Sequence, residues 1–147
     1  MSIERNKAVV RRLFEVWNGR DLDAIPELYS PDYVADYRPY APLTRGHDGI
    51  RGMVERAHAT FPDYREELLE LIAEGDRVVV HLRITGTQHG QWGPIPPTGK
   101  PVRFEEVVIL RLVDGKVVEQ RGIVDNLLAL RQIGVMPTPP AQRQEQA

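Results

Sequence analysis

The stretch PVRFEEVVILRLVDGKVVEQRGIVD, residues 101–125, decides the fold. Two segments rich in Val and Ile flank Asp114-Gly115, the short sequence most diagnostic of a tight β-hairpin. Period-two alternation divides each segment into two faces. One face of the first carries Val102, Phe104, Glu106, Val108, Leu110 and Leu112, and one face of the second carries Val117, Glu119, Arg121, Ile123 and Asp125. The stretch therefore predicts two long antiparallel strands.

Neither predicted strand has a purely polar side. A sheet that is covered by helices on one face normally alternates between core and water, so ionisable groups among Val, Ile and Leu indicate a cavity. The alternation leaves open which face of each strand looks inward. The cavity is a hypothesis at this point.

Two further strands are predicted upstream, in YREELLELIAEGDRVVVHLRITGT, residues 64–87. The first of them is ambiguous because Glu and Leu also favour helix. Between this pair and the hairpin lies GTQHGQWGPIPPTGKP, residues 86–101, which is too rich in Gly and Pro for regular structure.

The first half of the chain is predicted to be helical. Apolar residues three and four apart predict one helix through residues 9–17, stopped by Asn18-Gly19, and another through residues 50–61. Between them, Asp21 is expected to cap a short helix that ends at Pro31. An extended segment is expected at Tyr33–Asp36.

Helices followed by antiparallel strands predict an α+β domain with helices on one face of a curved sheet. The length of 147 residues suits one domain. We expect residues 1–134 to form it, and the Pro- and Gln-rich residues 135–147 to be a disordered tail.

Composition argues against several kinds of protein. The net charge of −2 gives no electrostatic footprint for nucleic acid, and the absence of cysteine rules out disulfides and thiol chemistry. The four histidines have no metal-binding spacing, so no metal site is predicted. Charges interrupt the N-terminus, and no apolar run is long enough to span a bilayer, so a soluble cytoplasmic protein without a membrane partner is expected.

Asp125 lies where the second hairpin strand meets the apolar helical segment NLLALRQIG. One interpretation is a helix N-cap, with the carboxylate accepting from the amides of Leu127 or Leu128. The other is a buried carboxylate whose pKa is raised by desolvation, able to take and return a proton near neutral pH. Both can hold at once. Among the histidines, His89, beside Trp92 in the irregular connection, is the best candidate to reach a ligand. Asp36, at the start of DYRPY, belongs either to a surface loop, which we favour, or to the rim of a pocket.

Four stretches, in their order and spacing, resemble the SnoaL-like polyketide cyclases, also called ester cyclases. They are VWNGRDLDAIPELYSPDYV (16–34), FPDYREELLELIAEGDRVVV (61–80), GTQHGQWGPIPPTGKPV (86–102) and LVDGKVVEQRGIVDNLLALRQIG (112–134). The resemblance covers residues 6–134, and its most specific pieces are PPTGK and DGKVVE followed by Asp125 and QIG.

The resemblance implies a cone-shaped α+β barrel, of the kind shared with nuclear transport factor two and ketosteroid isomerase, that encloses a pocket. It also implies an intramolecular aldol closure of a small hydrophobic polyketide ester in antibiotic biosynthesis, without cofactor or metal. Asp125 matches the acid/base aspartate of that family, and Asp36, His89, Trp92, Glu106 and Arg121 are expected to bind substrate.

This chain departs from the family pattern at three positions. Members commonly carry histidine where it has Asp36 and Gln88, and tryptophan where it has Arg121. Arg121 would bring a positive charge to the pocket, which suits an enolate or carboxylate ligand and favours an ionised Asp125. The alternatives are an isomerase, a dehydratase or an epoxide-opening enzyme on the same buried carboxylate, or a ligand-binding protein without catalysis. A homodimer is also expected, because an open curved sheet needs its outer face covered.

Overall fold

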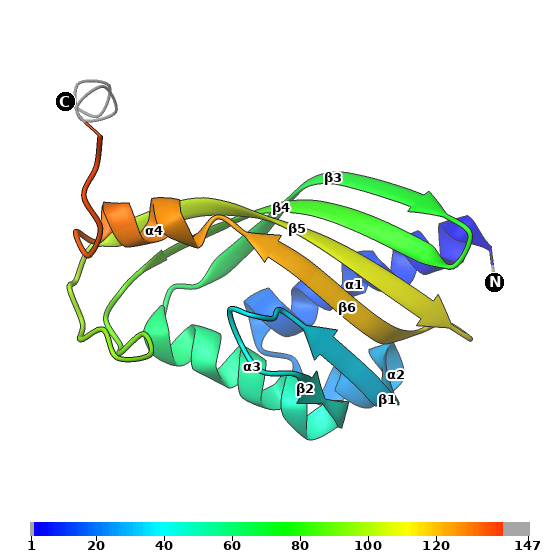
Figure 1. The fold of residues 1–147 in the computed structure, drawn as a ribbon. Helices are drawn as coiled ribbons and strands as arrows, with labels where there is room; N and C mark the ends of the chain where they lie inside the picture. Colours follow the sequence, from blue (N-terminus) through cyan, green and yellow to red (C-terminus); the bar gives the residue numbers. More distant parts are fainter. Residues whose placement is uncertain (1, 140–147) are drawn as a thin grey trace.

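A strongly curved six-stranded sheet forms the wall of the molecule in the computed structural model, which describes residues 2–139 (Figure 1). The strand order is β2-β1-β6-β5-β4-β3, and every neighbouring pair is antiparallel except the parallel pair β1 and β6. The strands are β1 (Tyr29–Asp36), β2 (Thr44–Arg45), β3 (Arg65–Glu74), β4 (Arg77–Thr87), β5 (Pro101–Val113) and β6 (Lys116–Val124). The predicted α+β fold on a mostly antiparallel, curved sheet is confirmed. The sheet curves without closing on itself.

The predicted hairpin is β5 and β6. Asp114 and Gly115 have φ angles of 50° and 78°, the left-handed values that a two-residue hairpin turn of type I′ requires at both positions. The face of β5 from Val102 to Leu112 is buried throughout. On β6 an irregularity opposite Arg111 and Leu112 turns Val117 inward. The prediction that Val117 shares a face with Glu119 and the rest of that set is therefore wrong, since the others look outward.

Helices cover the concave face of the sheet (Figure 1). They are α1 (Ile3–Gly19), η1 (Leu22–Ala24), α2 (Ile25–Leu28) and α3 (Gly46–Thr60), whereas α4 (Asn126–Gln132) follows the end of β6. Ser2 caps α1 through the amide of Arg5, and the helix ends at Arg20 with φ of 54°. Asp21 makes no capping hydrogen bond with its side chain, and Tyr29 already begins β1. The expectations of an Asp21 cap and of a helix ending at Pro31 are wrong.

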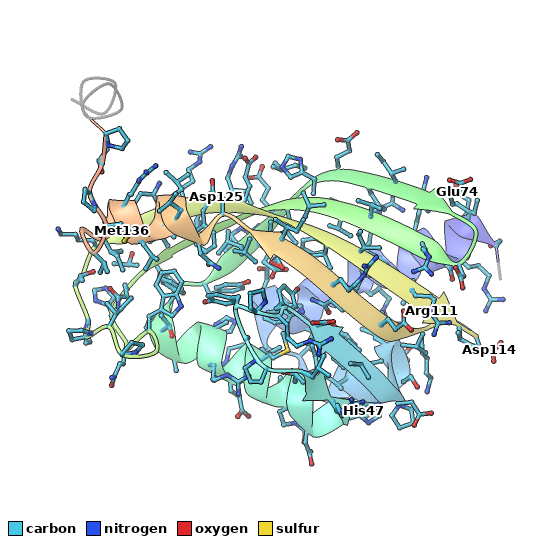
Figure 2. All side chains as sticks on the ribbon, viewed as in Figure 1. His47, Glu74, Arg111, Asp114, Asp125 and Met136 are labelled. Atoms are coloured by element: carbon cyan, nitrogen blue, oxygen red, sulfur yellow. The ribbon has the colours of Figure 1, made fainter. Side chains whose placement is uncertain are left out.

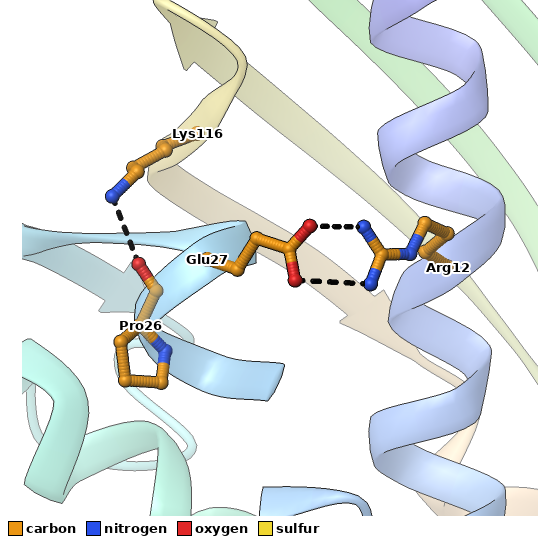
Figure 3. A network of polar contacts seen from close by, with 4 residues as sticks. All are labelled: Arg12, Pro26, Glu27 and Lys116. Carbon is orange, nitrogen blue, oxygen red and sulfur yellow. Dashed lines mark hydrogen bonds and ion pairs between the residues drawn. The ribbon is translucent and has the colours of Figure 1, made fainter. Parts of the chain in front are cut away.

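Polar contacts join α1, α2 and the start of β6 (Figure 3). Arg12 on α1 donates to both carboxylate oxygens of Glu27 on α2, at 2.6 and 3.2 Å. Lys116 at the start of β6 donates to the carbonyl oxygen of Pro26 at 2.9 Å. The contact of Lys116 joins β6 to a helix 90 positions earlier in the sequence. Ile25 in that helix and Tyr29 just after it are fully buried.

After α4 the chain has no helix or strand in residues 135–139. The amides of Val135 and Met136 still donate to the carbonyl oxygen of Leu130. The rest of the tail for which disorder was predicted, residues 140–147, lies outside the described residues. Within residues 2–139, no helix is both long and apolar enough to cross a membrane.

Candidate active site

A cavity of about 700 Å³ lies between the concave face of the sheet, the helices α1 and α3, and the loop that carries Trp92. This volume is within the range of roughly 300–1,000 Å³ that is typical of small-molecule sites. The wall is mainly apolar and aromatic, with Phe14, Trp17, Met53, Phe61, Trp92, Phe104, Val108 and Leu110 among the lining residues. A hydrophobic organic ligand fits this composition.

Glu106 places one carboxyl group in the wall of this cavity. It lies on the buried face of β5 opposite Val124 of β6, and its side chain lines the cavity. Its Oε1 accepts a hydrogen bond from the hydroxyl of Tyr37 at 2.8 Å. Tyr37 in turn accepts from Nε2 of Gln120 at 2.6 Å, and Gln120 accepts at Oε1 from the hydroxyl of Tyr33 at 2.6 Å. Three donors in series therefore point toward the carboxyl group of Glu106.

Glu66 places a second carboxyl group in the same cavity, from β3. Its Oε1 accepts from the hydroxyl of Tyr64 at 2.6 Å. Its backbone is held by Asn18 at the end of α1: the amide of Glu66 donates to Oδ1 at 2.6 Å, and Nδ2 donates to the carbonyl oxygen of Glu66 at 2.9 Å. Both glutamates are buried, and both line the cavity.

Burial shifts the proton affinity of both acids, because desolvation disfavours the charged form of a carboxyl group. It raises the pKa of Glu106 to about 7, against the opposing effect of the Tyr37 hydrogen bond. Burial, and then the charge of Glu106, raise the pKa of Glu66 to about 8, against the hydrogen bond from Tyr64. Groups with such values exchange protons readily near neutral pH.

Of the residues predicted to form the site, Trp92 and Glu106 line the cavity. The ring of Trp92 packs edge-on against Phe61 at 5.5 Å between centroids. Asp36 instead pairs with Arg38 at the surface, where two hydrogen bonds lower the pKa of its carboxyl to about 2. His89 and Arg121 are exposed and do not line the cavity. The expected pocket positions of Asp36, His89 and Arg121 are wrong.

Asp125 lies where β6 ends and α4 begins (Figure 2). Its Oδ1 accepts from the amide of Leu128 at 3.2 Å, so the helix-cap interpretation is confirmed. The side chain is exposed, whereas the neighbouring Val124 and Asn126 line the cavity. The expectation that Asp125 forms part of a buried wall is therefore wrong, because strand alternation turns it outward together with Arg121 and Ile123. Its acid/base role stays a prediction.

Sequence reasoning missed Glu66, Tyr64, Tyr37 and Gln120. For Glu66 the signal was present, since alternation puts it on the same face as Leu68. The hydrogen-bond chain through Gln120 joins residues 87 positions apart and leaves no local pattern. Arg56, at the end of α3, is the one basic residue among the described residues that line the cavity. Within residues 2–139, no group of His, Asp and Glu is arranged to hold a metal ion.

The family model of the SnoaL-like polyketide cyclases matches residues 7–133. Aklanonic acid methyl ester cyclase DnrD of Streptomyces peucetius is 28% identical over 138 residues, covering 92% of this chain and 95% of its own. Nogalonic acid methyl ester cyclase of Streptomyces nogalater is 28% identical over 123 residues, covering 83% and 92%.

Among solved structures, AclR of Streptomyces galilaeus, a proposed hydroxylase, is 31% identical. It superposes with a TM-score of 0.83 over 99% of this chain and 90% of its own. A proposed SnoaL-like polyketide cyclase from Jannaschia sp. CCS1 is 29% identical, with a TM-score of 0.83 over 93% and 97%.

Proposed function

Because the chain belongs to the SnoaL-like polyketide cyclase family, we propose that it closes a ring in a hydrophobic polyketide ester by an intramolecular aldol reaction, with Glu106 as the acid/base group. One observation carries the proposal: a buried carboxyl group with a raised pKa lines a largely apolar cavity. The similar proteins of Streptomyces peucetius and Streptomyces nogalater are cyclases of aklanonic acid and nogalonic acid methyl esters, which supports an ester of this class as the substrate.

The reaction needs a base at a carbon acid and close approach of two carbons. Glu106, as carboxylate, takes a proton from a carbon next to a carbonyl group. The resulting enolate attacks a second carbonyl carbon of the same molecule, and the alkoxide that forms is protonated. A confining cavity favours this step, since holding reacting groups together can remove about 7–11 kcal/mol of barrier.

The test is a comparison of three variants with aklanonic acid methyl ester as the probe substrate. Glu106→Gln keeps the shape of the side chain and loses the base, so kcat should fall by about 10²–10⁴-fold. Binding of the ester should change little. Glu105→Gln, one residue along on the opposite face of β5, is the matched control and should retain wild-type turnover.

Asp125→Asn decides between the two acids. Asn is as good an N-cap as Asp, so the fold is retained. We expect Asp125→Asn to turn over substrate at close to the wild-type rate and Glu106→Gln to lose turnover. The opposite pattern would return the acid/base role to Asp125.

Hydroxylation is a second candidate function, and the similarity to AclR favours it. An aldol closure gives a product with the atoms of its substrate, whereas a hydroxylase adds an oxygen atom. The mass of the product distinguishes the two. A buried carboxylate also suits isomerases and dehydratases, and the loss of water from the product would identify a dehydratase. Binding of the ester without turnover would indicate a ligand-binding protein. We expect turnover without added metal or organic cofactor.

We also infer a homodimer formed through the outer face of the sheet. Ile72, Val107 and Ile123 are 55%, 39% and 80% exposed there, and Val107 and Ile123 are direct partners on β5 and β6. Sedimentation should give a dimer at micromolar concentration, and Ile123→Lys should shift it toward monomer. A wild-type monomer contradicts this inference.

A further inference from the structure

We propose that Glu66 is a second catalytic residue: it donates the proton to the carbonyl oxygen that becomes an alkoxide during ring closure. This assignment rests on the proposed aldol reaction and on Glu106 as its base. It divides the chemistry between two carboxyl groups on one wall of the cavity, one that accepts a proton from carbon and one that gives a proton to oxygen.

The two carboxyl groups reach the cavity from the same face of the sheet. Glu66 on β3 pairs with Ile84 of β4, and Glu106 on β5 pairs with Leu82 of β4. Ile84 and Leu82 are two positions apart on one strand, so both acids project from the same side. A substrate lying along this wall meets both groups.

Each glutamate uses one oxygen for a tyrosine and leaves the other available. The Oε1 atoms of Glu66 and Glu106 accept from Tyr64 and Tyr37. Within residues 2–139, neither Oε2 atom has a hydrogen-bond partner, and neither is sealed from solvent. Because Oε1 is an acceptor in both, a proton on the neutral acid sits on Oε2. In Glu66 that proton is available to a ligand in the cavity.

Glu106 and Glu66 differ in their hydrogen-bond donors, and this difference favours Glu106 as the base and Glu66 as the acid. Glu106 stands at the end of a donor series from Tyr33 through Gln120 and Tyr37, which stabilises its carboxylate form. Glu66 accepts from Tyr64 alone, and no other group in the described part of the chain donates to the Tyr64 hydroxyl. Glu66 therefore holds its proton more tightly than Glu106.

The electrostatic environment of Glu66 also favours its protonated form. Burial and the Glu106 charge raise its pKa, while Tyr64 lowers it. The other titratable groups among the described residues that line the cavity are Tyr29, Tyr37, Tyr40 and Arg56. His58 of α3 contacts Tyr64 with 5.4 Å between ring centroids, and its Nε2 donates to the backbone carbonyl oxygen of Trp17, not to Glu66. Near neutral pH the favoured arrangement is ionised Glu106 beside neutral Glu66, because the charge of Glu106 adds to the burial that raises the pKa of Glu66.

The proposed cycle balances. Glu106 carboxylate takes a proton from carbon, the new carbon–carbon bond forms, and the carbonyl oxygen takes the proton of Glu66. This leaves neutral Glu106 and ionised Glu66. A proton then passes from Glu106 to Glu66 through water as product leaves, which restores the starting state without any co-reactant.

Hydrogen exchange at the substrate separates the two roles. In heavy water, removal and return of the carbon-bound proton by Glu106 introduces deuterium into unreacted ester, whereas ring closure also needs Glu66. We expect Glu66→Gln to lower closure by about 10²–10⁴-fold and to retain exchange within a few-fold of wild type. Glu106→Gln should lose both activities. Glu67→Gln, on the opposite face of β3, is the matched control and should retain both.

Two results would overturn the assignment: closure near the wild-type rate in Glu66→Gln, or a parallel loss of exchange and closure. Exchange and closure that both survive in Glu106→Gln would instead contradict the proposed base. Tyr64→Phe provides an independent measurement if Glu66→Gln fails to fold. It removes the hydrogen bond that lowers the Glu66 pKa, so the alkaline limb of the kcat profile should move to higher pH. An unmoved alkaline limb in that variant contradicts the assignment.

Discussion

At Tyr37, one hydroxyl group joins the acid in the cavity to the interior of the sheet. It donates to Glu106 at 2.8 Å and accepts from Gln120 at 2.6 Å. Tyr37→Phe deletes both hydrogen bonds and keeps the ring. Since the lost bond lowers the Glu106 pKa, we expect the acid limb of the kcat/KM profile to move to higher pH.

The cost in stability should be about 1–3 kcal/mol, because the Gln120 amide loses a buried partner. Urea titration measures it. Tyr40→Phe, at the exposed mouth of the cavity, is the control and should leave the profile in place. An unchanged acid limb in Tyr37→Phe would mean that this hydroxyl does not tune the base.

The position of a single residue could be predicted from the sequence where its apolar surroundings also indicated that its side chain is buried. Glu106 and Trp92 line the cavity as expected: Glu106 alternates with Phe104 and Val108 on the buried face of β5, and the ring of Trp92 packs against Phe61. Their role in binding substrate stays a prediction. Asp125 fitted two interpretations, a cap and a buried acid. Alternation identified its companions Arg121 and Ile123, yet not the direction in which that face looks. Only the packing of the helices on the other side fixes that direction.

Strand β6 passes so close to Tyr37 that one of its positions has no room for a side chain. A Cβ atom on Gly122 would overlap the ring, with the Tyr37 Cζ atom only 2.7 Å away. We expect Gly122→Ala to displace the ring from Glu106, with a loss of about 1–3 kcal/mol of stability and reduced kcat/KM.

Gly19→Ala is the control for this substitution, since nothing lies within 4 Å of the added atom there. Thermal unfolding and kinetics of the two variants measure the effect. Wild-type kinetics in Gly122→Ala would show that the position of Tyr37 is not critical for turnover.

Helices and strands were predicted best where a long apolar segment and the residues of the adjoining turn indicate the same structure. The β5–β6 hairpin follows from Asp114-Gly115 and a long run of Val and Ile. β3 was ambiguous because its Glu and Leu residues also favour helix, and that ambiguity concealed Glu66. Tyr29 was assigned to a helix by spacing, whereas it pairs with Val117 in the sheet. Such long-range pairing overrides local propensity.

For the molecule as a whole, the two buried acids make stability depend on pH. Their pKa values rise from 4.5 to about 8 for Glu66 and about 7 for Glu106 on folding. The folded chain thus keeps protons that the unfolded chain releases. Their contribution to the free energy of unfolding is full below pH 4.5 and is lost as pH rises through the folded values.

We therefore expect the free energy of unfolding to fall between about pH 5 and pH 8, by about 1.4 kcal/mol for each group and pH unit at most. In Glu66→Gln the free energy of unfolding should fall less steeply with pH, because only the smaller contribution of Glu106 remains. Glu67→Gln is the exposed control. Urea titrations at several pH values measure the slope, and an equal slope in wild type and Glu66→Gln would contradict the shifted pKa.

Asn18 has a consequence beyond holding Glu66. β3 is the last strand of the sheet, so its outer backbone groups would be open to pairing with a strand of another chain. The amide of Asn18 occupies both the N–H and the C=O of residue 66, as a neighbouring strand would do. The same side chain that holds the backbone of an acid in the cavity thus also occupies two groups of the sheet edge to which a strand of another chain could otherwise bind.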